Sequence, residues 1–85
     1  PKAADACEWK AEYVSATALP KEAKAFDKIN RSMTLKKIIQ KLGPASKDVG
    51  SGLHVLEWKV ADGRVFRISV ANACEKPIAI GFHDP

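Results

Sequence analysis

The sequence contains few cysteines, and they are far apart. Cys7 and Cys74 are the two cysteines in a chain of 85 residues. Their separation excludes the CxxC pairs of thiol-disulfide oxidoreductases and of most zinc modules. Two alternatives remain: a pair of reduced thiols, or one disulfide closing a long loop. In the chain-entropy model such a disulfide stabilises the fold by about 4 kcal/mol. We favour the disulfide between Cys7 and Cys74, and with it an oxidising compartment.

Long apolar runs are absent as well. No stretch approaches the roughly 18 apolar residues of a membrane-spanning helix, so the sequence predicts no transmembrane segment. The N-terminal PKAADAC also lacks the hydrophobic region of a signal peptide. We therefore expect either a mature exported chain or a cytosolic one.

Charge of one sign is nowhere concentrated. The net charge is +4, from 14 basic and 10 acidic residues that are interspersed along the chain. Lys36, Lys37 and Lys41 come closest to a cluster, but they fall on the polar side of a predicted helix, where solvated lysines are common. This distribution does not favour nucleic acid as a partner. A basic module that binds anionic lipid or nucleic acid stays open as an alternative.

Catalytic and metal-binding patterns are missing too. Ser51 lies in a GSG loop without the preceding strand and following helix of a nucleophile elbow. The two histidines, His54 and His83, have no further ligands at metal-binding spacing. We therefore expect a protein that is not an enzyme and has no cofactor and no metal site.

The composition predicts a folded domain. An apolar fraction of 46% with 28% charged residues is typical of globular proteins. The length allows one domain over residues 1–85, which we divide into an N-terminal arm, 1–19, and a helix pair plus sheet, 20–83. Trp9 and Tyr13 are one helical turn apart, which fits a helical or extended arm packed on the domain.

Two helices are predicted after the arm. The first is a short amphipathic helix with Ala23, Phe26 and Ile29 on its apolar side. The second is MTLKKIIQKLGP, with Thr34 as N-cap and Gly43 as the left-handed C-terminal residue. Its apolar stripe comprises Leu35, Ile38, Ile39 and Leu42.

Three strands follow a polar connection at residues 45–52. Their sequences are LHVLEWKV, RVFRISVAN and PIAIGFH, and in each the large apolar residues share one parity. The predicted core-facing set is Leu56, Trp58, Val60, Phe66, Ile68, Val70, Ile78, Ile80 and Phe82. We therefore predict an α+β fold in which two short helices pack on one face of a three-stranded antiparallel sheet, in the order helix-helix-strand-strand-strand.

The hairpin between the first two strands has one register that agrees with this parity. A two-residue DG loop would place Trp58 opposite Arg67 and mix core with surface. A three-residue ADG loop places Trp58 opposite Phe66, as a type I turn with a G1 bulge that requires Gly63 at positive φ. The same register predicts an exposed ion pair between Glu57 and Arg67 on the other face.

The second face of the sheet is the best candidate for binding. The register brings small, apolar and charged side chains to it: Val55, Glu57, Lys59, Val65, Arg67, Ser69, Ala79 and His83. This face is either open to a partner or solvated and partly covered by the arm. Trp9 and Tyr13 of the arm are further candidates for partner contact.

The segment FDKINRSMTLKKIIQKLGP resembles the family of SmpA/OmlA (BamE-like) outer-membrane lipoproteins and the secreted β-lactamase inhibitor protein. The matching positions are Phe26, Ile29, Met33, Thr34, Ile39, Gly43 and Pro44, and WKVADGRVFRISV is similar to the family's hairpin. The likeness covers roughly residues 23–83. It departs at Ser32, where members commonly have glycine, and it comprises one unit where the inhibitor resembles two in tandem.

The resemblance implies a periplasmic or secreted protein-binding module that uses its sheet face, either as an envelope assembly factor or as an enzyme inhibitor. AADAC around Cys7 lacks the pattern of a lipidation site, which favours a soluble chain over a lipid-anchored one. The alternatives are an immunity protein against a cognate toxin and the basic module described above. We expect the partner to be another protein, and the chain itself to be a monomer or weak dimer.

Overall fold

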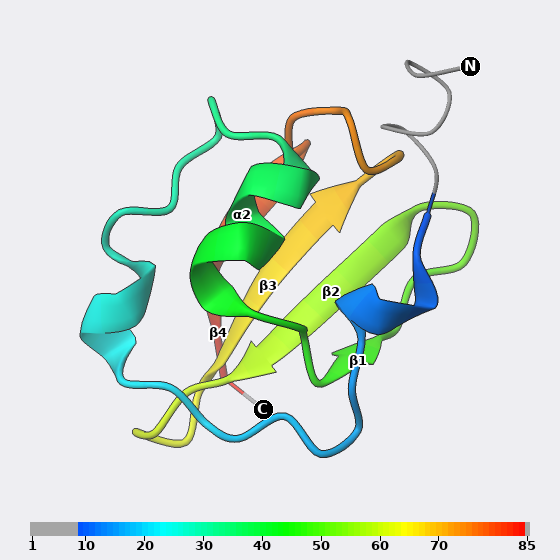
Figure 1. Cartoon of the computed structure of the whole chain (residues 1–85). Helices are drawn as coiled ribbons and strands as arrows, with labels where there is room; N and C mark the ends of the chain where they lie inside the picture. The colour runs from blue at the N-terminus through cyan, green and yellow to red at the C-terminus, as the bar shows by residue number, and fades with distance from the viewer. Residues whose placement is uncertain (1–8, 85) are drawn as a thin grey trace.

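The computed structural model describes residues 9–84, in which one antiparallel sheet carries a single α-helix on one of its faces (Figure 1). The sheet order is β1-β2-β3-β4, and the strands are Lys47–Asp48, His54–Lys59, Val65–Val70 and Ala79–His83. The helix is α2, Leu35–Leu42, and two 3₁₀ turns precede it, η1 (Ala11–Tyr13) and η2 (Ala23–Phe26). The α+β class is therefore confirmed, whereas the predicted two helices and three strands differ from the structure of this part of the chain.

Helix α2 begins and ends where the sequence predicts. The Thr34 hydroxyl accepts a hydrogen bond from the Lys37 backbone N–H at 3.3 Å, which makes Thr34 the N-cap. At the other end Gly43 has φ +79°, and its N–H donates to the Ile39 carbonyl at 2.7 Å. The buried residues of the helix are Leu35, Ile38 and Leu42. Local capping and one apolar stripe thus account for its length.

The first predicted helix forms only the 3₁₀ turn η2. Ala23, Phe26 and Ile29 repeat strictly every three positions, which is the period of a 3₁₀ helix, whereas an α-helical stripe combines spacings of three and four. The hydrogen bonds have the same period, because Asp27 and Ile29 donate their N–H groups to carbonyls three residues earlier. The prediction of a second α-helix is wrong, although Phe26 and Ile29 are buried.

The predicted polar connection contains an additional strand, β1, which pairs antiparallel with β2. The Asp48 carboxylate closes the turn between these strands by accepting hydrogen bonds from the N–H groups of Gly50 and Val55, at 2.9 and 3.0 Å. β1 is two residues long and has no alternating apolar pattern, so the sequence does not show it as a strand.

The β2-β3 hairpin has the predicted register. Trp58 lies opposite Phe66, and Glu57 lies opposite Arg67. Gly63 has φ +96°, as the three-residue loop requires. The predicted core-facing parity of these two strands is therefore confirmed.

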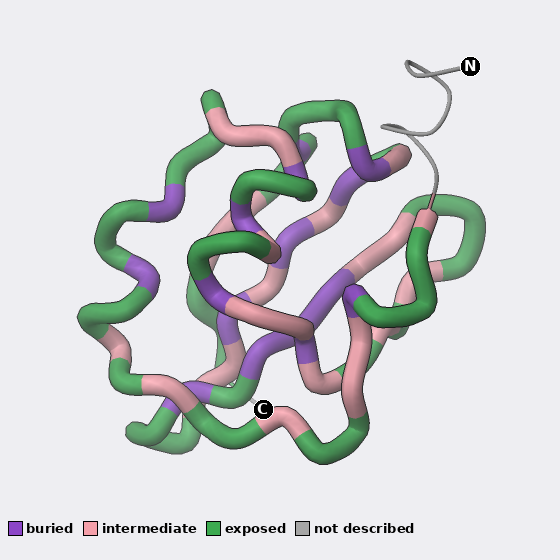
Figure 2. Tube along the Cα trace, in the orientation of Figure 1, coloured by how far each residue is buried: buried purple, intermediate pink, exposed green. Residues whose placement is uncertain are grey.

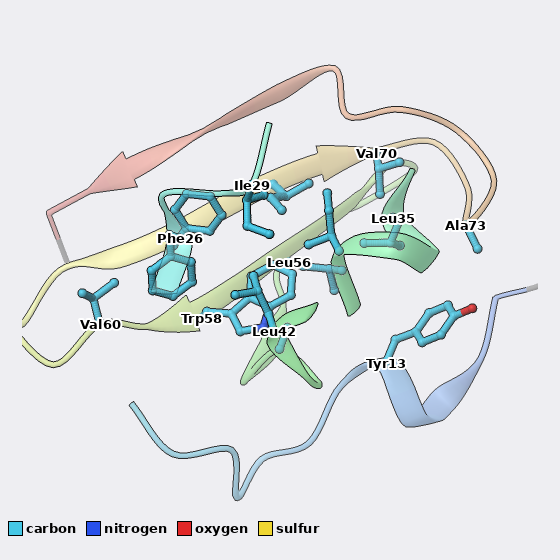
Figure 3. Close-up of a cluster of buried hydrophobic side chains, with 14 residues drawn as sticks. Tyr13, Phe26, Ile29, Leu35, Leu42, Leu56, Trp58, Val60, Val70 and Ala73 are labelled. Carbon is cyan, nitrogen blue, oxygen red and sulfur yellow. The ribbon is translucent and has the colours of Figure 1, made fainter. Parts of the chain in front are cut away.

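The core lies between α2 and the sheet (Figures 2 and 3). Its buried residues are Tyr13, Phe26, Ile29, Leu35, Ile38, Leu42, Ala45, Leu56, Trp58, Val60, Phe66, Ile68, Val70 and Ala73. The Trp58 indole N–H donates to the Gly43 carbonyl at 3.1 Å, which ties β2 to the end of α2. Ile78 and Phe82 share the core-facing parity of β4, but they are 54% and 37% exposed. The prediction that they are buried is wrong, because the fully buried side chains of the sheet come from β2 and β3 and from Val60 just after β2, and β4 contributes none.

We expect Gly63→Ala to lower the free energy of unfolding by about 1–2 kcal/mol, since an alanine is strained at a left-handed φ. The melting temperature should fall by at least about 4 °C, measured by circular dichroism in dilute protein. Gly81→Ala is the matched control, because Gly81 does not have positive φ and an added Cβ there meets nothing within 4 Å. Equal melting temperatures for the two variants would contradict the role of the bulge.

Candidate functional site

The face of the sheet opposite α2, here called the outer face, is the candidate site. Cross-strand pairing arranges its side chains in three rows: Val55-Ser69-Ala79, Lys47-Glu57-Arg67-Gly81 and Lys59-Val65-His83. These rows bring together all the candidates predicted on β2, β3 and β4. Within residues 9–84, α2 and both 3₁₀ turns place their buried side chains in the core on the other face. The role of the outer face in binding stays a prediction.

An ion pair at the centre of the outer face joins Glu57 to Arg67. The Glu57 Oε2 atom accepts hydrogen bonds from Nε of Arg67, at 2.8 Å, and from its Nη2, while Oε1 lies 3.6 Å from Lys47 Nζ. The prediction of an exposed pair is wrong, because Glu57 is only 4% exposed. Lys47 and Arg67 lie opposite Glu57 on β1 and β3, so the carboxylate has a long side chain on each side of it.

The rows carry more positive than negative charge. Lys47, Lys59 and Arg67 share these rows with one acidic residue, Glu57, which leaves a net charge of two positive units within the rows. The side chains of Lys47 and Arg67 are 64% and 37% exposed. Gly81 lies opposite Arg67 on β4 and has no side chain to cover it. The guanidinium is thus held by Glu57 and accessible from the β4 side.

Trp9 and Tyr13 lie on the helix side of the sheet. Tyr13 is 5% exposed within the core, and Trp9 stacks on His54 with ring centroids 3.7 Å apart. Since His54 has the core-facing parity of β2, the described part of the arm, from residue 9 onward, packs on the side of α2. The interpretation in which this part of the arm covers the outer face is wrong. Trp9 and Tyr13 therefore lie on the opposite side of the sheet from the candidate residues of the outer face.

The predicted disulfide involves Cys7, which lies outside the described residues. Cys74 follows β3 and does not have a free thiol. Its backbone N–H donates to Oδ1 of Asn72 at 3.1 Å, which fixes the turn that carries it. The pairing of Cys7 with Cys74 stays a prediction.

A contact that sequence reasoning missed joins Asp48 to His54. Oδ2 of Asp48 lies 2.8 Å from Nδ1 of His54, while Oδ1 accepts from two backbone N–H groups. Partial burial raises the pKa of the Asp48 carboxyl, but the hydrogen bonds from His54 and the backbone outweigh burial and hold that pKa below its ordinary value. An aspartate two residues before a glycine was the available signal for this turn. Because the carboxylate orients the imidazole on which Trp9 stacks, the contact anchors the arm.

Residues 9–84 contain no group of three or more side chains that could hold a metal ion, and no helix among them has the length and apolar character to cross a membrane. Comparisons with protein-family models, with curated proteins and with solved structures find no match to this chain.

Double-mutant cycles should separate the two ion pairs of Glu57. We expect a coupling energy of about 1–2 kcal/mol between Glu57→Ala and Arg67→Ala, reduced from the value of a fully buried pair by the exposure of Arg67. The cycle of Glu57→Ala with Lys47→Ala should give less than about 0.5 kcal/mol, because the Lys47 ammonium is farther away and mostly solvated. Urea unfolding measures both. Equal couplings would contradict the assignment of Arg67 as the main partner.

Asp48→Asn should flatten the acid limb of the stability curve. Because the pKa of Asp48 in the folded chain lies below its ordinary 3.8, its stabilising contribution is present above pH 3.8 and is lost as the pH falls through the folded value. The wild-type chain should therefore lose more unfolding free energy between pH 6 and pH 2 than Asp48→Asn. Parallel curves for the two proteins, measured by urea unfolding across this range, would refute the assignment.

Proposed function

We propose that this chain is a small exported protein-binding module, without catalytic activity, that holds its partner through the outer face. The observation that supports this proposal is the fixed position of Arg67 at the centre of that face. Hydrogen bonds from Nε and Nη2 to the buried Glu57 restrict the arginine before any partner arrives. Binding therefore costs little additional conformational entropy. Arginine in a central, well-ordered position is typical of binding hot spots.

The charge of the outer face favours an acidic partner surface. Lys59 is exposed, and Arg67 has five N–H donors, of which Glu57 uses two. A carboxylate of the partner can accept from the remaining donors while Lys47 and Lys59 attract it over a longer range. The small neighbours of Arg67, Gly81 and Ala79, leave room for that approach.

Two roles fit such a module in the cell envelope, an assembly factor and an inhibitor of an enzyme. The exported setting is inferred from the predicted disulfide and from the resemblance to the SmpA/OmlA family. An immunity protein would use the same face against a cognate toxin. A toxin gene next to the gene for this chain would support that alternative, and a signal peptide in its precursor would support export.

Lys59→Glu should weaken the complex at least about tenfold and leave the fold intact, since Lys59 is an exposed member of the outer face. The partner is first isolated from envelope extract, and its affinity for each purified variant is then measured by calorimetry. Lys37→Glu is the matched control, because it reverses the same charge at an exposed position of α2. Arg67→Glu is unsuitable, because it places a second carboxylate beside the buried Glu57 and is expected to unfold the chain.

Equal losses in Lys59→Glu and Lys37→Glu would contradict the proposal, since they would indicate attraction to the net charge alone. The basic-module alternative is tested with vesicles of anionic lipid and with a short DNA duplex. Affinity that falls steeply with salt for either probe would support that alternative. Absence of binding at low ionic strength would eliminate it.

A further inference from the structure

Strand β4 is an open edge of the sheet within the described residues. The order β1-β2-β3-β4 gives it one neighbour, β3. Edge strands commonly carry lysine or another charged residue that deters further pairing, but Ala79–His83 contains no Lys, Arg, Asp or Glu. The outward backbone N–H and C=O groups of β4 are therefore available to another strand.

An apolar strip runs beside this edge on the helix side. It consists of Ile78, Ile80 and Phe82, of which Ile78 and Phe82 are 54% and 37% exposed. The Phe82 ring is held by the ring of Phe66, with centroids 5.2 Å apart, and by the Arg64 guanidinium at 4.2 Å. An open edge beside a fixed apolar strip favours an added strand with apolar side chains of its own.

We propose that β4 pairs antiparallel with β4 of a second copy of this chain, about a two-fold axis at Gly81. With the axis at Gly81, every residue of Ala79–His83 pairs with a residue of the same strand in the second copy. Ile80 then lies opposite Phe82 of the second copy on the helix side. On the outer side Gly81 meets Gly81, and Ala79 meets His83, so the side chains nearest the axis are small. Each copy then covers part of the exposed strip of the other, and one sheet runs through both.

Charge complementarity favours a second copy over an unrelated strand. Nη2 of Arg31 donates to the Ile78 carbonyl at 3.0 Å, so its charge lies at the start of β4. The proposed register places Ile78 opposite Asp84 of the second copy. Arg31 of each copy therefore meets Asp84 of the other, and the two-fold axis forms this ion pair twice. The inference does not depend on the proposed function, because it uses the edge of the sheet and not the outer face.

Sedimentation equilibrium of the full chain over a range of concentrations tests the dimer. The mean mass should rise from 9.2 kDa toward twice that value as the concentration increases. Arg31→Glu should raise the dissociation constant at least about tenfold, because it sets a carboxylate against Asp84. The double variant Arg31→Glu/Asp84→Arg should recover most of the lost affinity, since it restores the pair with its signs exchanged.

Two further variants control for net charge and for register. Lys37→Glu changes the net charge as Arg31→Glu does, but on α2, and should leave the dissociation constant unchanged. Gly81→Cys should form an intermolecular disulfide under mild oxidation, because its Cβ meets nothing within 4 Å and lies opposite its symmetry mate. A mass that stays at 9.2 kDa near millimolar concentration, a double variant no tighter than Arg31→Glu, or a dimer that does not cross-link at position 81 would each overturn the proposal.

Discussion

The register of the β2-β3 hairpin is the constraint on which both faces of the sheet depend. Because side chains alternate between the faces, a slip of one residue would move Trp58 to the outer face and bring Glu57 beneath α2, where its charge would be costly. The bulge at Gly63 prevents that slip by making the loop three residues long. One turn therefore decides what the core contains and which charges the outer face presents.

The parts of the fold that are determined by residues close together in the sequence could be predicted from it. Helix α2 carries its N-cap, stripe and terminating glycine within one short segment, and the hairpin follows from parity and one glycine. η2 and β1 depend on contacts between distant segments. Phe26 stacks on Phe66 with ring centroids 4.4 Å apart, and the three-residue repeat, although it fits a 3₁₀ turn, does not show this contact between distant segments.

The candidate site shows the same division between local and distant causes. Parity assigns Glu57 and Arg67 to one face, but the burial of Glu57 depends on β1, a strand that no pattern in the sequence marks. The position of the arm depends on a parallel bridge between Val14 and Ala45, which joins segments that have no recognisable pairing signal. For this reason the sequence left open whether the arm with Trp9 covers the outer face, and the structure places Trp9 on the other side of the sheet.

The small size of α2 explains why the apolar side of the described sheet is only partly covered. An α-helix with its side chains is about 10 Å across, and strands lie about 4.8 Å apart, so one helix covers about two strands. The fully buried side chains of the strands belong to β2 and β3, and the apolar side of β4 is left partly exposed. Another element has to cover that strip if it is to be buried, and a second copy can do so without using the outer face. In such a pair, two Arg67 side chains would lie on either side of the paired glycines, so a partner with two acidic sites would bind both copies at once and gain affinity without any new type of contact.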